Sequence, residues 1–399
     1  MKEGYKKTEL GWIPDEWEVG KFEDILVPRK ETFNPKIEEN EMYVGLEHIE
    51  EVTGRLICTG NSSDTSSIKN KFYNGDILFG KLRPYLRKYY MTDFNGVCVT
   101  EILVLTKKKS NNKFCYYSLQ QDNFIEYINS KTFGTKMPRT SWNDIKEYPV
   151  CIPPLKEQQK IAEILSSVDT QIDDTDKLIE KTKELKKGLM QRLLTKGIGH
   201  TEFKITEVGE IPMEWEVKSL LEVANFNNGK AHEKNICEIG DFIVVNSKFI
   251  STEGEIKKYS NENISPLNKG DITLVMSDVP NGRAIGKCYL IDKDNKYTLN
   301  QRICCLRTEE MDKEFLFYYL NRNSYFLKFD DGAKQTNLRK EEVLGCPIRI
   351  PKIEEQKQIA NILSSVDAQI EDYENKKTKL EELKKGLMQK LLTGKIRVV

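Results

Sequence analysis

A cluster of basic and tyrosine side chains in residues 75–90 could bind an anionic polymer. Within eight residues after a short apolar run the chain supplies Lys81, Arg83, Tyr85, Arg87 and Lys88. Lysine and arginine bind phosphates, arginine also matches the hydrogen-bonding edge of guanine, and tyrosine adds a phosphate hydrogen bond or an apolar contact. The alternative is that these side chains are surface cations beside a hairpin.

A similar segment occurs in the second half of the chain. The residues Gly-Asp-Ile begin it at position 270, as they do at position 75, and it continues to Arg283 and Lys287. Recurrence at a corresponding place favours a function for the loop as a whole more than for any one of its members.

A second kind of cluster precedes each of two long helical segments. Residues 131–141 contain Lys136, Arg139 and Ser141, and residues 332–340 contain Lys334, Asn337 and Arg339. Glycine, hydroxyl and cationic residues in one loop suit phosphate binding. The alternative is a turn in which Thr140 or Ser141 caps a following helix, and both interpretations can hold together.

Sequence patterns typical of enzymes do not accompany these clusters. The Gly-Lys at the end of residues 75–81 is followed by Leu82, which is wrong for a nucleotide-binding P-loop, and no glycine-rich S-adenosylmethionine loop occurs. The three histidines have no second ligand type spaced around them, and the nine cysteines include no CxxC pair. We expect no catalytic residue, no metal site and no cofactor in this chain, and reduced thiols that serve mostly in packing.

The charge balance bears on possible partners. The chain has 62 basic and 62 acidic residues among 399, so its net charge is zero. A protein that binds DNA strongly by itself usually carries a basic excess, so local basic sites and contacts from partner proteins are expected instead. No apolar run approaches the ~20 residues of a membrane span, and the N-terminus lacks the apolar core of a signal peptide. We expect a water-soluble, cytoplasmic protein without a membrane partner.

The elements that must position these clusters repeat at a constant offset of 198 residues. Residues 157–195 realign on residues 355–393 with 25 identities in 39 positions. A period this long holds a whole domain and a connector, not one solenoid unit. The sequence predicts domains at 1–152 and 199–350, here called the first and second modules, and helices at 153–198 and 351–399.

Each repeated helix begins after proline and carries a 3.5-residue apolar seam interrupted by threonine or lysine, including Lys186 and Lys384. The simplest closure of the chain pairs the helices as an antiparallel coiled coil. Gly188 and Gly386 inside them are either tolerated defects or points where another backbone or a partner chain approaches. The predicted seam and docking residues are Ile161, Leu165, Val168, Ile172, Leu189, Leu193, Ile359, Leu363, Val366, Ile370, Leu387 and Leu391.

The modules are less alike than the helices. Short apolar runs at 43–46, 76–79, 97–99, 241–245 and 271–276 alternate with Asn, Gly and Asp turns, which predicts strands. Helical stretches are expected at 113–129 and 313–323. The predicted fold class is therefore α+β: two globular modules with curved sheets, joined by two long helices in a pseudo-twofold tandem repeat.

With these features the chain resembles the DNA-specificity (S) subunit of type I restriction-modification systems. The most specific part is Pro-x-x-Glu-Gln-x-x-Ile-Ala-x-Ile-Leu-x-x-x-Asp at 154–169, repeated at 352–367 with Lys352 in place of the proline. Residues 11–14, 43–47, 75–79 and the Arg-Pro-Tyr at 83–85 also resemble the target-recognition domains of that family. The second module lacks the Arg-Pro-Tyr.

The resemblance implies a non-enzymatic sequence reader. Each module would read one half of a bipartite, asymmetric site in double-stranded DNA, and the helices would set the spacer between the halves. The helices would also dock two methylation subunits, which would supply the S-adenosylmethionine site, and restriction (translocase) subunits would join that core. The alternative is a coiled-coil scaffold whose modules bind other proteins; a fused methyltransferase or nuclease is disfavoured by the missing motifs.

Overall fold

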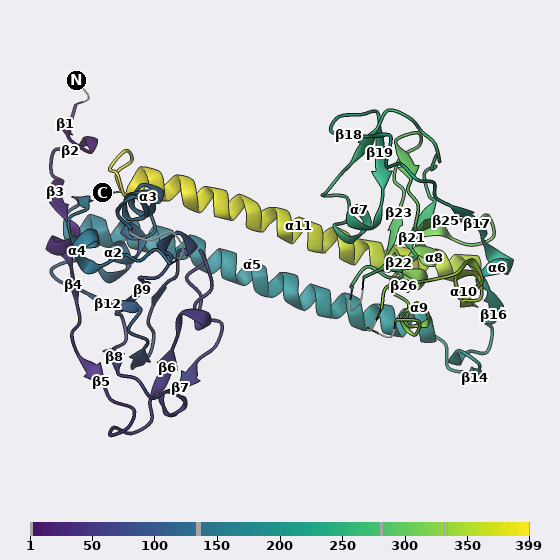
Figure 1. Cartoon of the computed structure of the whole chain (residues 1–399), viewed down its shortest axis with the longest axis horizontal. Coiled ribbons are helices and arrows are strands. Elements are labelled where there is room, and N and C mark those ends of the chain that lie inside the picture. Colours follow the sequence, from purple (N-terminus) through teal and green to yellow (C-terminus); the bar gives the residue numbers. More distant parts are fainter. Residues whose placement is uncertain (1–2, 133–136, 280–281, 331, 333, 399) are drawn as a thin grey trace. The chain divides into compact units, whose positions relative to one another are not determined.

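The structure is a computed structural model that describes residues 3–132, 137–279, 282–330, 332 and 334–398. The chain divides into two compact units, of which residues 1–177 with 374–399 form the first and residues 178–373 the second (Figure 1). Each unit holds one module and parts of both long helices, α5 (Leu155–Lys196) and α11 (Ile353–Leu391). The predicted α+β tandem organisation is confirmed. The four-segment division stays a prediction, because the compact units cut across both helices.

The first module contains two sheets. The antiparallel sheet has the strand order β10 (Tyr89–Met91), β9 (Ile77–Gly80), β12 (Ile102–Lys107) and β4 (Leu26–Pro28). The second sheet, in which β11 and β6 are parallel, has the order β5 (Thr32–Phe33), β8 (Lys69–Phe72), β11 (Gly96–Cys98), β6 (Met42–Val44) and β7 (Gly60–Asn61). The first module also has the pairs β1 (Tyr5–Thr8) with β2 (Gly11–Pro14) and β3 (Glu18–Lys21) with β13 (Pro149–Ile152), and the helices α1 (Phe22–Ile25), α2 (Asn112–Ser118), α3 (Asp122–Lys131) and α4 (Trp142–Lys146).

The second module repeats the antiparallel sheet and the parallel strand pair, but the order of its second sheet differs. Its antiparallel sheet has the order β17 (Asn225–Asn228), β25 (Ile303–Arg307), β21 (Ile272–Val275) and β23 (Cys288–Leu290). Its second sheet, in which β19 and β24 are parallel, has the order β18 (Ile236–Cys237), β20 (Tyr259–Ser260), β19 (Phe242–Val245) and β24 (Tyr297–Leu299). The remaining elements are the pairs β14 (Phe203–Thr206) with β15 (Gly209–Pro212), β16 (Glu216–Ser219) with β27 (Pro347–Ile350) and β22 (Ser277–Asp278) with β26 (Thr336–Asn337), and the helices α6 (Leu220–Val223), α7 (Ser247–Ser251), α8 (Lys313–Leu320), α9 (Ser324–Leu327) and α10 (Lys340–Leu344).

All five predicted apolar runs form strands, which are β6, β9, β11, β19 and β21. The helix predicted at 113–129 is instead two helices, α2 and α3, because the chain turns at Leu119–Gln121. The turn lets α3 place Phe124, Ile125 and Ile128 in the core beside Phe22. Helical periodicity on both sides of so short a break hides it in the sequence.

The repeated Glu-Gln at the start of each long helix fastens that helix to its module. Glu157 accepts a hydrogen bond from the indole of Trp17 at 2.9 Å, and Glu355 accepts the corresponding bond from Trp215 at 2.9 Å. Both tryptophans are fully buried. The neighbouring Gln158 accepts from the backbone N–H of Asn111, just before α2. A buried carboxylate and amide are costly unless they are bonded, so these contacts define how the helix enters its module.

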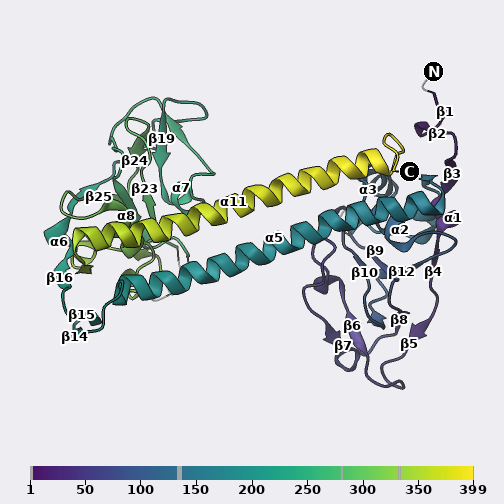
Figure 2. The same cartoon turned by 180° about the vertical axis from the view of Figure 1, so that it is seen from behind.

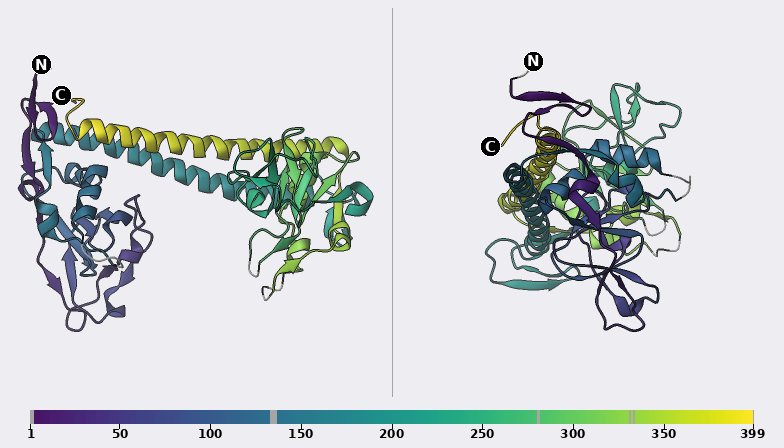
Figure 3. Two further views of the ribbon diagram at one scale, coloured as in Figure 1. Left: turned by 45° about the horizontal axis from the view of Figure 1, so that its top comes forward. Right: turned by 90° about the vertical axis from the view of Figure 1, so that its left-hand side faces the viewer.

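Each long helix also ends against a module. In the first unit the C-terminal segment after α11 brings Arg397 to Glu157 at 3.0 Å, and to Glu16 at 2.7 Å. In the second unit the segment after α5 brings His200 to Glu355 at 2.9 Å. The segment after α11 therefore lies beside the loop between β2 and β3 in the first unit (Figures 2 and 3).

The two helices are antiparallel in both units. In the first unit Asp169 of α5 pairs with Lys384 of α11 at 2.7 Å, and Asp176, one heptad later, pairs with Lys377, one heptad earlier, at 2.7 Å. In the second unit Lys186 pairs with Asp367 at 2.5 Å, ten residues further along α5 and ten residues back along α11. The register is therefore the same in both units.

The predicted seam residues are interior residues of this chain. Among the described residues, Val168 and Ile172 form an apolar cluster between the helices with Leu380. The partly buried Leu387 packs against this cluster and also against the first core. Val366 and Ile370 are buried as well, and Leu189 is partly buried against the second core. The outer positions instead enter the module cores: Ile161, Leu165 and Leu391 in the first unit, and Leu193, Ile359 and Leu363 in the second. The sequence pattern could not separate helix–helix packing from helix–module packing, because both need apolar residues at the same spacing.

Candidate nucleic-acid interface

In the first module the structure joins the two clusters that the sequence left apart. The backbone N–H of Arg83 donates to the carbonyl of Pro138 at 2.8 Å, and that of Thr140 donates to the carbonyl of Lys81 at 3.0 Å. Leu82 and Arg139 form the β-bridge between these bonds. The loop after β9 and the segment before α4 thus make one continuous rim, here called the first rim (residues 81–85 and 137–141).

The cationic and aromatic side chains of the first rim differ in how far they are exposed and in whether they are bonded within the chain. Arg83, in the left-handed conformation at φ 50°, is exposed, and Tyr85 is 50% exposed. Arg139 donates to Glu101 at 3.1 Å but keeps 58% of its side chain exposed. Lys81 is half-buried at the end of β9. Lys136 lies outside the described residues.

Arg87 and Lys88, predicted as part of the same cluster, have bonds within the chain. Arg87 forms an ion pair with Asp122 at 2.7 Å, and Lys88 donates to the carbonyl of Leu46 at 2.8 Å. Ser141 is the N-cap of α4 with Asp144 completing a capping box. The capping interpretation therefore holds for Ser141, and the same residue stays on the rim.

The second module builds an equivalent rim from different side chains. The N–H of Leu338 donates to the carbonyl of Met276 at 2.7 Å, which corresponds to the bond from Thr140 to Lys81. Ser277 and Asn337 then pair as Leu82 and Arg139 do. The second rim (residues 277–279, 282–283 and 334–339) exposes Arg283, Lys334, Asn337 and Arg339.

Lys287 does not belong to that exposed set. Its ammonium donates to the carbonyl of Ser251 at 2.9 Å and lies 3.2 Å from Glu253. Its carbonyl accepts from Val275, as that of Lys88 accepts from Gly80, so the two lysines occupy equivalent places. Both lysines fasten a neighbouring loop of their own module.

Sequence reasoning missed a third segment of each rim, the turn that precedes β12 or β25. The carbonyl of Glu101 accepts from the N–H of Lys81 at 2.8 Å, and the carbonyl of Arg302 accepts from that of Met276 at 3.0 Å. Arg302 is exposed and has φ 69°. A lone acidic or basic residue after a strand carries no signal, so only the pairing of distant segments could reveal it.

Metal-ligating side chains and thiols are the other groups whose chemistry can be judged from the described residues. Across residues 3–132, 137–279, 282–330, 332 and 334–398 no group of three or more metal-ligating side chains occurs. All nine cysteines are free, and burial raises the pKa of Cys151 to about 11 and that of Cys346 to about 12. A thiol with so high a pKa stays protonated at neutral pH and is a poor nucleophile.

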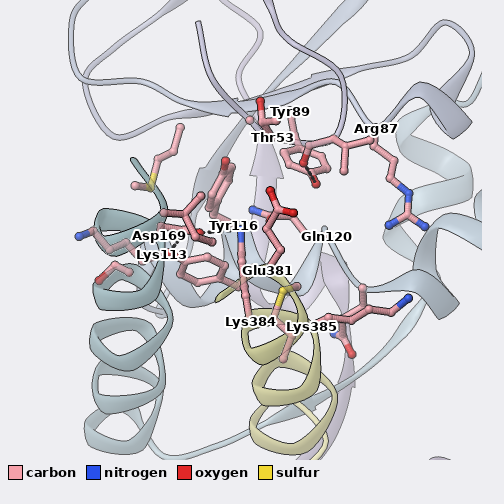
Figure 4. A pocket seen from close by; sticks show the side chains of 18 of the residues that line it. Thr53, Arg87, Tyr89, Lys113, Tyr116, Gln120, Asp169, Glu381, Lys384 and Lys385 are labelled. Carbon is pink, nitrogen blue, oxygen red and sulfur yellow. Dashed lines mark hydrogen bonds and ion pairs between the residues drawn. The ribbon is translucent and has the colours of Figure 1, made fainter. Parts of the chain in front are cut away.

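A cavity of about 870 Å³ lies in the first unit between the module and the two helices (Figure 4). Arg87, Tyr89 and Gln120 line it from the module, and Asp169 and Lys384 line it from the helices. Its charges largely neutralise one another, since Arg87 pairs with Asp122 and Lys384 pairs with Asp169. Apolar side chains, including Met91 of the module and Ile172 and Met388 of the helices, line the cavity as well. None of the helices within the described ranges has the length and apolarity to cross a membrane.

Known proteins with the same organisation agree with this description. The family model of the type I restriction modification DNA specificity domain matches residues 14–184 and again residues 212–384. The chain is 30% identical over its full length to the type I restriction enzyme MjaVIII specificity subunit of Methanocaldococcus jannaschii, and the match covers 97% of that protein.

Two solved structures share the fold. One is the S subunit of a type I restriction-modification system from M. genitalium, with a TM-score of 0.58, 18% identity and coverage of 94% of this chain and 96% of that chain. The other belongs to a study of complex assembly and conformational transition in the type I R-M system, with a TM-score of 0.61, 17% identity and coverage of 96% and 99%. At these identities the likeness concerns the fold alone. The two family matches and the full-length relative show that this chain belongs to the type I restriction-modification DNA specificity subunits, and that sequence-specific DNA recognition is its function.

Proposed function

We propose that each rim reads one half of a bipartite, asymmetric site in double-stranded DNA. The observation that carries this proposal is that the same backbone bonds build both rims while their side chains differ. Arg139 in the first rim corresponds to Asn337 in the second, and Lys81 corresponds to Met276. Arginine favours guanine and asparagine favours adenine, so unlike half-sites are expected. The DNA-binding role of the individual rim residues, including Lys81, Tyr85 and Ser141, belongs to this proposal.

Mapping methylated adenines across a host genome tests the proposal. The expected result is two unlike half-sites separated by a gap of constant length. A palindromic or uninterrupted recognition sequence would contradict it. This outcome also separates the proposal from the rival in which the modules bind proteins, because a scaffold without sequence reading predicts that the chain does not alter which sites are methylated.

We further propose that the chain is non-catalytic and works in the cytoplasm, where its DNA lies, with two methylation subunits and with restriction (translocase) subunits. S-adenosylmethionine would bind the methylation subunits, not this chain. Exposed faces of the helices support docking at two equivalent places. Leu185 is 54% exposed beside Gly188, and Leu383, at the same position of the repeat, is 49% exposed beside Gly386.

The two glycines strengthen the docking proposal. A methyl group added to Gly188 or Gly386 would meet no atom within 4 Å in the described chain, and both helices continue through them. A helical glycine costs about 1 kcal/mol relative to alanine. No part of the described chain packs against either glycine. Two such glycines at equivalent places therefore favour close approach of a helix from a partner. Equivalent sites support two copies of one partner, the methylation subunit.

Gly188→Gln and Gly386→Gln are expected to block docking one site at a time. Because glutamine is a good helix former and no atom crowds either site, the melting temperature of the isolated chain should not fall. Each single change should reduce the methylation subunits recovered with the chain from two to one, and the double change should remove both, as measured by native mass spectrometry. Glu163→Gln, on an exposed position of α5 far from Gly188, is the matched control. Recovery of two subunits with the double variant would refute docking at the glycines.

A further inference from the structure

The lysines that interrupt the helix seam make the same contacts in both units. Lys384 of α11 lies 2.7 Å from Asp169 of α5, and the hydroxyl of Tyr117 in α2 donates to the other oxygen of Asp169 at 2.7 Å. The ammonium of Lys384 also lies 5.7 Å from the centre of the Tyr117 ring. Figure 4 shows Asp169 and Lys384 projecting from their helices beside the cavity. One carboxylate thus joins three elements.

The second unit has the same group with the helices exchanged. Lys186 of α5 lies 2.5 Å from Asp367 of α11, and the hydroxyl of Tyr318 in α8 donates to Asp367 at 2.8 Å. Lys186 lies 5.6 Å from the centre of the Tyr318 ring. The two groups, here called the Tyr–Asp–Lys clusters, are Tyr117/Asp169/Lys384 and Tyr318/Asp367/Lys186. The tyrosines do not follow the 198-residue offset, so the repetition of the contact is a property of the folded chain.

A cation in an apolar seam normally lowers stability but selects one register, because any shift leaves the charge without its partner. Here the aspartate that pairs with the lysine also accepts a hydrogen bond from a tyrosine of the module. The side chain of Lys384 is 17% exposed and that of Lys186 is 26% exposed, so neither is free to contact DNA. Burial and the bonded carboxylates raise the pKa of both tyrosines, which keeps each hydroxyl protonated as the donor.

We propose that Lys186 and Lys384 are positioning residues that tie each recognition domain to a single register of the helix pair, and so to a single spacer between the DNA half-sites. This inference rests on the bipartite reading proposed above and on the expectation that the helices set the spacer between the half-sites. Around the cavity of the first unit the cluster acts together with the ion pairs of Arg55 to Asp173 and Asp176. The cluster recurs in the second unit, so both modules have this contact with the helices. A shift of one helix along the other would break the ion pair between the aspartate and the lysine of each cluster. A rotation of the module would break the hydrogen bond between the tyrosine and the same aspartate.

The test replaces each seam lysine by methionine in the assembled complex with methylation subunits. Methionine fills the same volume and suits a helix seam, so the fold should be kept. We expect modification at the normal spacer to continue while discrimination against spacers one base pair longer or shorter falls about tenfold, the change that corresponds to 1.4 kcal/mol. Half-site sequences should not change, because the rims are untouched. Lys186→Arg and Lys384→Arg, which keep the positive charge that pairs with the aspartate, should keep the normal discrimination between spacers.

Tyr117→Phe and Tyr318→Phe provide a second measurement that removes one hydroxyl from each cluster and leaves the seam intact. They should relax the spacer to a smaller extent. Lys187→Met, at an exposed neighbouring position, is the matched control. Unchanged spacer discrimination in the methionine and phenylalanine variants would overturn the inference, as would lower total modification without any broadening. A wild-type site without a spacer would instead overturn the proposed function.

Discussion

Removing one heptad from each long helix is expected to shorten the DNA spacer by about three base pairs. Seven residues of α-helix span about 10.5 Å, and base pairs are stacked about 3.4 Å apart. The deletions that preserve the register are residues 177–183 in α5 and 370–376 in α11, because Asp176 pairs with Lys377 in the first unit and Lys186 with Asp367 in the second. The apolar seam keeps its phase, and both Tyr–Asp–Lys clusters stay intact.

The paired deletion is measured by mapping methylated adenines in cells that carry the variant. Its matched control removes residues 177–183 alone, which displaces the ion pairs of one helix from those of the other and should prevent assembly. If the paired variant is active and its sites keep the original spacer, the length of the helices does not set the spacer. A chain that loses both half-site sequences would contradict the independence of the two modules.

Replacing Arg83 and Arg139 together by alanine is expected to abolish modification by removing recognition of one half-site. Both side chains project from the first rim, and a base-edge contact by arginine contributes about 1–3 kcal/mol of discrimination. If either arginine contacts a phosphate instead, the loss will be uniform across sequences, and the slope of log affinity against log salt will fall by about 0.9 for each lost contact. Binding of the complex to site and non-site duplexes over a salt series distinguishes these outcomes.

Lys109→Ala is the control for charge, since Lys109 is exposed and follows β12 away from the rim. Arg87→Ala is the second control, because the ion pair of Arg87 with Asp122 holds it beside the cavity and not on the first rim. Full modification by the Arg83/Arg139 double variant would exclude the first rim as a DNA-reading surface. Equal losses in Arg87→Ala and the double variant would mean that local stability, not contact with DNA, explains the effect.

The offset of 198 residues was enough to predict two modules and two long helices. Strands followed from short runs of branched and aromatic residues between turn residues, and these predictions were confirmed at β6, β9, β11, β19 and β21. The break between α2 and α3 was missed, because a three-residue turn does not interrupt helical periodicity enough to be seen.

The sequence predicted the basic clusters of the candidate site but not how the chain brings them together. The sequence placed Arg83 and Arg139 in separate clusters, and nothing short of strand pairing could show that they share one rim. It also grouped Arg87 and Lys88 with Arg83, although they bond to Asp122 and Leu46. Residue type predicts that a cation can bind phosphate, but an intramolecular carboxylate or carbonyl competes for the same group.

The sequence by itself determined the duplication, the kinds of elements and the likeness of the two helices, because repetition and periodicity are local properties of a chain. Only the tertiary structure decided which cations lie on the rims, which seam residues belong to module cores, and why lysines interrupt the seam. Those outcomes depend on partners far away in sequence: Asp169 for Lys384, Asp367 for Lys186 and Pro138 for Arg83.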